Sequence, residues 1–232
     1  MSATLECKDL TKYYGPNPAL ADVNIELPAG RIIGLLGPNG SGKTTLIKLA
    51  CGLLTPSSGE IRVCGYQPSV ESKALVSYLP ERSYLPDWMT VTECLGYFQD
   101  FYPDFDYERA VSMLESLHVP PAARMKTLSK GTKEKVQLVL VMSRRAKLYL
   151  LDEPIGGVDP AARDYILNTI ITNYCEDSTI LISTHLIADI EKVLDEFIFI
   201  QNGQIVSYAS TDALREDKGK SVDEYFREVF RC

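Results

Sequence analysis

The sequence predicts an α/β fold with a mostly parallel sheet that carries helices on both faces. Residues 31–36 and 148–151 are continuously apolar, as strands buried on both faces of a sheet are. A glycine-rich turn follows the first of these segments, and a helical pattern then runs from about residue 43 to 54. Strand and helix patterns alternate again from residue 147 onward, which favours parallel strands joined by helices.

The first thirty residues predict an antiparallel β subdomain. Residues 4–13 and 19–27 alternate polar and apolar side chains on either side of a glycine- and proline-rich turn. Gly52 and the turn-forming cluster at 55–59 are expected to end the helix that is predicted to begin at residue 43.

A helical pattern interrupts the strands from about residue 85 to 142. Thr90 and Glu93 have the spacing of a capping box, in which each side chain satisfies a free backbone N–H. We expect a helical subdomain at 85–145, inserted into an α/β core formed by 1–84 and 146–232. The later strands are expected at 147–151, 179–183, 197–200 and 204–208.

The overall charge argues against a nucleic-acid partner. The chain of 232 residues has a formal net charge of -7, and an acidic surface repels nucleic-acid phosphates. No apolar run reaches the roughly 18–20 residues that span a bilayer, and residues 1–10 lack an apolar signal core. We therefore expect a cytoplasmic protein. The six cysteines form no C-x-x-C pair and are expected to be small buried hydrophobes.

The turn at residues 37–44 predicts a phosphate-binding loop. It matches G-x-x-x-x-G-K-[ST] and lies between a buried strand and a helix, where backbone N–H groups and the helix N-terminus attract phosphate oxygens. Lys43 is expected to reach the β- and γ-phosphates, and the Thr44 hydroxyl to bind Mg²⁺. The expected phosphate-binding residues are Gly37, Pro38, Asn39, Gly40, Ser41, Gly42, Lys43, Thr44 and Thr45.

Two acidic residues follow the apolar strand at 148–151. Because ligands bind at the carboxyl ends of parallel strands, Asp152 is placed to hold Mg²⁺ and Glu153 to take a proton from an attacking water. His185 follows the next strand and is expected to position that water or to hydrogen-bond the γ-phosphate. His118 lies outside any motif and is interpreted as structural.

These motifs, in this order, resemble the nucleotide-binding domain of ABC transporters over nearly the whole chain. The resemblance implies that Tyr14 stacks on adenine. Residues 128–132 read Leu-Ser-Lys-Gly-Thr where the family has Leu-Ser-Gly-Gly-Gln, so Ser129 and Gly131 would touch the γ-phosphate bound to another subunit. Glu81 stands where the family has a glutamine, and its carboxylate is expected to bind Mg²⁺ or a water. Asp159 would cap a helix and contact the second subunit.

The resemblance implies a P-loop NTPase core of the RecA-like type that binds ATP and Mg²⁺. It also implies ATP hydrolysis by a homodimer or heterodimer, which would drive transport through a separate membrane-spanning permease. The chain would then lie on the inner face of the cell membrane. The departures at Glu81 and Lys130 favour export of a drug, peptide or lipid-like molecule.

Two other functions remain open from the sequence. One is an ABC ATPase that acts on ribosomes or DNA, although such proteins commonly have paired ATPase domains or long coiled-coil insertions. The other is a phosphate-loop kinase, which would not explain the segment at 128–132. For the transporter, we expect residues 81–88 to contact a helix of the membrane subunit through Tyr84, Leu85 and Trp88; the alternative is that these side chains pack inside the helical subdomain. The tail at 222–230 is expected to pack on its own domain.

Overall fold

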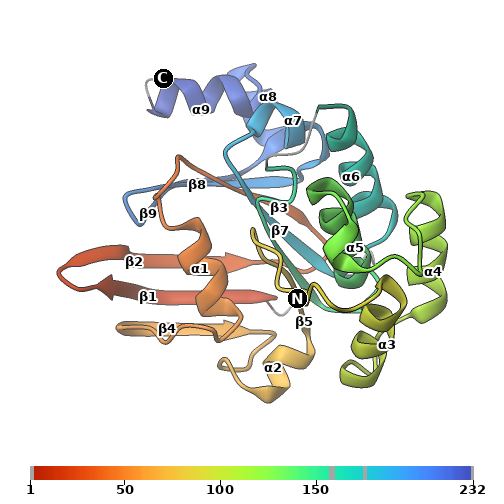
Figure 1. The fold of residues 1–232 in the computed structure, drawn as a ribbon. Coiled ribbons are helices and arrows are strands. Elements are labelled where there is room, and N and C mark those ends of the chain that lie inside the picture. Colours follow the sequence, from red (N-terminus) through yellow and green to blue (C-terminus); the bar gives the residue numbers. More distant parts are fainter. Residues whose placement is uncertain (1–2, 157–159, 175–176, 231–232) are drawn as a thin grey trace.

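The computed structural model describes residues 3–156, 160–174 and 177–230, and their strands form two sheets (Figure 1). The smaller sheet is antiparallel, with the order β2-β1-β4. The larger sheet has the order β5-β6-β7-β3-β8-β9 and is parallel except for β9, which runs antiparallel to β8. This arrangement confirms the predicted α/β class, its mostly parallel sheet and its N-terminal antiparallel part.

The strands of the smaller sheet come from the first quarter of the chain. They are β1 (Leu5–Tyr14), β2 (Asn17–Leu27) and β4 (Ser58–Val63). The strands of the larger sheet are β3 (Ile32–Leu36), β5 (Val76–Leu79), β6 (Leu148–Asp152), β7 (Thr179–Thr184), β8 (Glu196–Gln201) and β9 (Gln204–Ser210).

Strand β3 explains why the central strands are continuously apolar. Alternate side chains of a strand point to opposite faces, and here both faces are covered. Ile33 and Leu35 pack into the core shared with the smaller sheet and α1 (Lys43–Ala50). Ile32 and Leu36 pack into a second core, together with the helices on the other face. The larger sheet is therefore the middle layer of the molecule.

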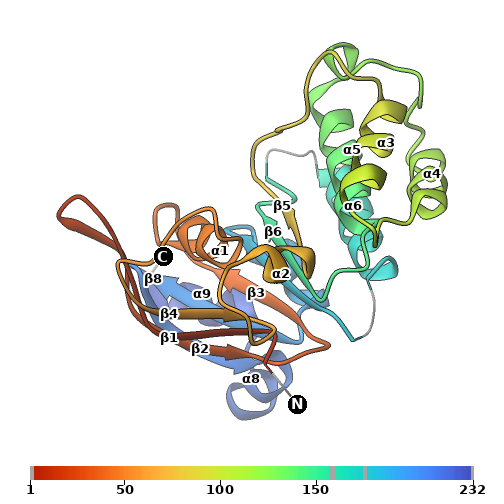
Figure 2. The same ribbon diagram turned by 90° about the horizontal axis from the view of Figure 1, so that it is seen from below.

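The helices between β5 and β6 gather at one end of the molecule, away from the smaller sheet (Figure 2). They are α3 (Val91–Phe101), α4 (Tyr107–Ser116) and α5 (Lys130–Met142), with a 3-10 turn at Met125–Thr127. The predicted capping box is present: Thr90 N donates to Glu93 Oε2 at 2.7 Å, and Glu93 N donates to Thr90 Oγ1 at 3.2 Å. The subdomain boundaries at 84/85 and 145/146 remain a prediction.

The remaining helices flank the larger sheet. They are α2 (Val70–Ala74), α6 (Pro160–Thr172), α7 (Ile187–Ile190) with a 3-10 turn at Glu191–Val193, α8 (Thr211–Lys218) and α9 (Val222–Phe230). The tail packs on its own domain, as predicted. Tyr225, Phe226 and Phe230 of α9 surround Phe199, with ring centroids 5.3 to 5.8 Å apart.

One predicted helix end was wrong, and two strands were not predicted. The first helix ends at Ala50 and not at residue 54, because the chain turns at Gly52 with a φ of 63°. Strands β4 and β5 were not predicted. Strand β4 begins with exposed polar residues, and β5 has only four residues, so neither carries a strong pattern of its own. Pairing with β1 and with β6 forms them.

The described helices are all too short or too polar to cross a bilayer. Cys7, Cys51 and Cys94 are buried and free, which agrees with the prediction for them, and Cys64 is partly buried. Cys175, Cys232 and the predicted helix cap Asp159 lie outside the described residues. His118 is exposed, just after the end of α4.

The N-cap of α4 gives a prediction for stability. Asp106 Oδ1 accepts the backbone N–H of Arg109 at 3.1 Å, and Oδ2 accepts from the Arg145 guanidinium at 3.0 Å. These bonds favour the charged carboxylate and lower the pKa of Asp106 below its usual value. Asp106→Ala should lower the free energy of unfolding by about 1 kcal/mol at neutral pH.

The pH dependence of that loss follows from the direction of the shift. A carboxylate whose folded pKa is lowered stabilises the fold above its unfolded pKa, and this contribution disappears as the pH falls through the folded pKa. Urea unfolding of wild type and Asp106→Ala should therefore converge below about pH 3. Asp106→Asn is the control, since it keeps an N-cap acceptor without the titration. An equal loss for Asp106→Ala at every pH would contradict this account.

Candidate functional site

Two glycines of the loop between β3 and α1 lie so close to neighbouring strands that a side chain would not fit. A Cβ on Gly37 would lie 2.3 Å from the carbonyl oxygen of Ile200, at the end of β8. Gly42 caps α1 with a φ of 113°, and a Cβ there would lie 2.6 Å from the carbonyl oxygen of Ala19 in β2. A bond from Gly203 N to Ser41 O, 2.9 Å long, fastens the loop to the β8–β9 turn. Side chains at Gly37 and Gly42 would displace the loop.

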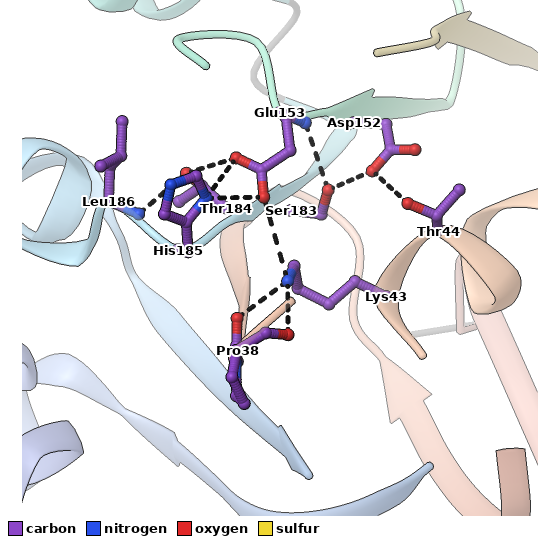
Figure 3. Close-up of polar contacts among 10 residues, drawn as sticks. Pro38, Lys43, Thr44, Asp152, Glu153, Ser183, Thr184, His185 and Leu186 are labelled. Atoms are coloured by element: carbon purple, nitrogen blue, oxygen red, sulfur yellow. Dashed lines mark hydrogen bonds and ion pairs between the residues drawn. The ribbon is translucent and has the colours of Figure 1, made fainter. Parts of the chain in front are cut away.

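Lys43 is held over this loop by backbone carbonyls. Its Nζ donates to Gly37 O at 2.8 Å and to Pro38 O at 3.1 Å, and it lies 3.9 Å from Glu153 Oε1 (Figure 3). Burial lowers the pKa of Lys43, while the negative charges of Glu153, Asp152 and Glu81 oppose that shift. A buried ammonium that is directed along a glycine-rich loop is suited to an anionic ligand such as phosphate.

Asp152 ends β6 and joins three parts of the site. Its Oδ1 accepts from Thr44 Oγ1 of α1 at 3.1 Å and from Ser183 Oγ of β7 at 2.5 Å (Figure 3). Burial raises the pKa of Asp152, nearby Glu153 and Glu81 raise it further, and the two hydroxyl donors oppose the shift.

The oxygen atoms around Asp152 fit a magnesium ion. A carboxylate next to a threonine hydroxyl is the hard oxygen donor set that Mg²⁺ prefers. Asp152 Oδ2 is buried and has no hydrogen-bond partner within the described part of the chain. A cation would also offset the unfavourable burial of this charge.

Glu153 leaves the strand in a backbone conformation that is uncommon for a non-glycine residue. Its φ is 52°, and its backbone N–H donates to Ser183 O at 2.9 Å. The carboxylate is fixed at the end of β7: Thr184 Oγ1 donates to Oε2 at 3.0 Å, and His185 Nδ1 lies 3.1 Å from both oxygens (Figure 3). Strained backbone of this kind is concentrated at functional sites.

A cavity of about 770 Å³ opens above the loop. Eight positions that sequence reasoning selected from the loop and the two strand ends line it: Asn39, Gly40, Gly42, Lys43, Thr44, Thr45, Glu153 and His185. Glu81, which sequence reasoning also selected, lines it as well. One face of α5, formed by Lys130, Lys133, Glu134 and Gln137, closes the opposite side. Gly37, Pro38, Ser41 and Asp152 are not among the lining residues, but they hold Lys43 and Thr44 in place or adjoin them.

Three predicted residues are not brought to this cavity within one chain. Tyr14 ends β1 with 51% of its side chain exposed, and Lys12 Nζ lies 5.8 Å from its ring centroid. Ser129 caps α5, where its Oγ accepts the backbone N–H of Thr132 at 3.2 Å. Gly131 lies in the first turn of α5 with open space around it. Neither Ser129 nor Gly131 lines the cavity.

Sequence reasoning gave no role to three polar side chains of the site. Ser183 and Thr184 bind the two carboxylates, and a signal for them existed, because hydroxyl residues at the carboxyl end of a parallel strand face the ligand edge. Gln137 is buried on α5 beside the cavity. No pattern in the sequence distinguishes it from a core residue.

Comparison with known proteins identifies the family. The family model described as ABC transporter matches residues 20–156. The ABC transporter ATP-binding protein YtrB of Bacillus subtilis (strain 168) is 31% identical over 218 residues, which cover 92% of this chain and 74% of YtrB. The ABC-type transporter ATP-binding protein EcsA of the same organism is 30% identical and matches 97% of this chain and 96% of EcsA.

Solved structures agree with this match. The ATP-binding subunit of an ABC transporter superposes with a TM-score of 0.89 at 30% identity, covering 98% of this chain and 99% of that one. A nucleotide-free ATP-binding cassette of an ABC transporter, 23% identical with a TM-score of 0.77, shares the fold. With these relatives and the geometry of Lys43, Asp152 and Glu153, the chain belongs to the ATP-binding, ATP-hydrolysing proteins of the ABC transporter family.

Proposed function

We propose that the chain binds Mg·ATP in the cavity above the loop and hydrolyses it to drive export through a separate membrane-spanning subunit. The observation that carries this proposal is the convergence of Lys43, Asp152 and Glu153 beside the cavity. The family relationship favours this function over an ATPase that acts on ribosomes or DNA, and over a kinase.

Each residue has a distinct role in the proposed reaction. The backbone N–H groups of residues 39–42 and the Lys43 ammonium bind the phosphates. Thr44 and Asp152 would hold a magnesium ion, which would supply positive charge beside the phosphoryl oxygens. Glu153 accepts a proton from the attacking water, and His185 and Thr184 orient its carboxylate. Glu81, which also lines the cavity, would bind the ion or one of its waters.

The exposed residues that lie outside the cavity support a dimer, formed by identical or related subunits. Ser129 and Gly131 at the N-terminus of α5 would contact the γ-phosphate bound to the partner, and the helix N-terminus favours such an anion. Tyr14 would stack on the adenine of its own nucleotide. ATP then bridges the two chains and its hydrolysis separates them, which is a ligand-biased two-state change.

A second cavity is suited to the membrane subunit. It has a volume of about 830 Å³ and is lined by aromatic residues of the helical part, by the end of α1 and by α2. Tyr97, Phe98, Phe101 and Tyr102 come from the helical part, and Tyr78 of β5 and Tyr84 complete the aromatic lining. Lys48, Lys73 and Arg82 add positive charge. We infer that an amphipathic helix with acidic residues docks in this groove and holds the chain on the inner face of the membrane.

The three residues of 81–88 that are expected to contact the membrane subunit lie at different places relative to the groove. Tyr84 lines the groove, whereas Leu85 packs against the core of the helical part. Trp88 is 70% exposed and does not line the groove. Export is proposed by analogy with the Nod factor export ATP-binding protein I of Rhizobium meliloti, which is 29% identical and matches 94% of this chain and 67% of that protein.

Removal of the proposed base tests the catalytic assignment. Glu153→Gln keeps the size and polarity of the side chain but cannot accept a proton, so turnover should fall by at least about 100-fold while nucleotide still binds. Fluorescent ATP binding and phosphate release measure the two effects. The variant should also form a dimer on ATP addition, seen by ultracentrifugation. Phosphate release at the wild-type rate would refute the role of Glu153.

The hydroxyl of Thr184 tests whether the Glu153 carboxylate must be held in place. Thr184→Val removes the donor to Oε2 with little change in volume, and kcat should fall on the order of 10- to 100-fold at nearly constant KM for ATP. Thr184→Ser keeps the hydroxyl and should retain most of the activity. Equal losses for both variants would instead indicate a packing role.

The groove is tested by binding to the membrane subunit. Phe101→Ala removes a 64% exposed aromatic side chain that lines the groove, and affinity for the subunit in detergent or nanodiscs should fall by about tenfold. Trp88→Ala is the matched control outside the groove and should bind more tightly than Phe101→Ala. The reverse order would favour the surface around Trp88. Thermal unfolding of each variant checks that the fold is intact.

A further inference from the structure

Three buried polar side-chain atoms near the catalytic residues lack hydrogen-bond partners in the described part of the chain. One is Ser41 Oγ in the phosphate loop, and the other two are Gln137 Nε2 on α5 and Asp152 Oδ2 at the end of β6. Gln137 is 2% exposed and Asp152 is 1% exposed. Buried donors and acceptors are nearly always paired, because an unpaired one is costly. A donor and an acceptor that are both unpaired therefore indicate a shared partner.

Gln137 and Asp152 line the same small cavity, which adjoins the large one above the loop and shares Gln137 with its lining. Its volume is about 20 Å³, which is enough for one water molecule. Glu81, Glu134 and Glu153 also line this cavity. A single water in this cavity can accept a hydrogen bond from the Gln137 amide and can donate to the surrounding carboxylates. A buried water commonly makes two to four hydrogen bonds.

We propose that Gln137 is a positioning residue that acts on Asp152 through one water molecule bound in this small cavity. The Gln137 amide donates to the water, and the water donates to Asp152 Oδ2. The other oxygen of Asp152 already accepts from Thr44 and Ser183. Both oxygens of the carboxylate are then fixed, one by α1 and β7 and the other by α5.

The water links the helical part of the chain to the metal-binding carboxylate. Gln137 lies on the face of α5 that also carries Lys130, Lys133 and Glu134 at helical spacing, and this face lines the large cavity. A movement of α5 relative to β6 would break or form the bridge and thereby change how Asp152 is oriented. This inference rests on the proposed role of Asp152 as a magnesium ligand.

A crystal structure of the metal-free protein tests the water directly. At a resolution that shows ordered water, density should lie within hydrogen-bond distance of Gln137 Nε2 and Asp152 Oδ2. In Gln137→Met, which keeps the length of the side chain without the donor, the water should be absent or shifted away from residue 137. Wild-type density with an empty cavity, or with Gln137 bonded elsewhere, would overturn the proposal.

The dependence on Mg²⁺ tests the consequence. Partners that orient a metal ligand commonly change metal affinity by 10- to 100-fold, so Gln137→Met should raise the Mg²⁺ concentration for half-maximal hydrolysis by about tenfold. The same variant should weaken Mn²⁺ binding, followed by electron paramagnetic resonance, at unchanged affinity for metal-free ATP. A purely structural role for Gln137 would leave the metal dependence unchanged.

A control and a comparison separate the possible failures. Gln99→Met changes an exposed glutamine on α3 and should behave as the wild type. If the wild type hydrolyses Mg·ATP and Gln137→Met shows the same metal dependence as the wild type, only this inference is refuted. Wild-type protein that does not hydrolyse Mg·ATP would instead refute the proposed function. If Gln137→Met fails to fold, the wild-type crystal structure alone decides.

Discussion

One carboxylate holds the site together. Asp152 Oδ1 accepts hydroxyl donors from α1 and from β7 at the same time, so the phosphate loop, the strand that ends in Asp152 and the strand that leads to His185 meet at one atom. This geometry depends on register: Asp152 pairs with Ser183 across β6 and β7, and Leu36 pairs with Thr184 across β3 and β7. A slip of one residue would turn Ser183 to the opposite face of the sheet.

Asp152 and Lys43 place charge in the interior of the protein, which is unfavourable without a ligand. Burial lowers the pKa of Lys43 and raises that of Asp152, so each group is harder to keep charged than in water. A phosphate beside Lys43 and a cation beside Asp152 would offset both costs.

Helix α5 connects this site to the rest of the molecule. Its first turn carries Ser129 and Gly131 at the surface, its middle face lines the large cavity, and Val141 near its end lines the aromatic groove. A rigid helix that contributes to the two cavities and to an exposed terminus can transmit a displacement between them. Such an arrangement is suited to a subunit in which nucleotide, partner chain and membrane protein act on one another.

The sequence alone determined the α/β class, the phosphate loop, the acidic strand end and the family, because each depends on local patterns: apolar runs, glycine spacing and short motifs. It also identified the capping box of α3 and the aromatic face of α9, which follow from helical periodicity. Strands β4 and β5 escaped prediction, since pairing with β1 and β6 forms them and their own residues carry little signal. The roles assigned to Tyr14, Ser129 and Gly131 depend on nucleotide and on a second chain.

Only the tertiary structure decided which distant polar groups meet. Ser183, Thr184 and Gln137 are unremarkable in the sequence, yet two of them bind the carboxylates and the third lies beside Asp152 in a buried cavity. Their importance comes from the register of parallel strands, which joins residues 31 positions apart, and from the packing of α5 beside the end of β6. Hydrogen bonds act over about 3 Å, so partnerships of this kind depend on the folded backbone and leave no periodic trace in the chain.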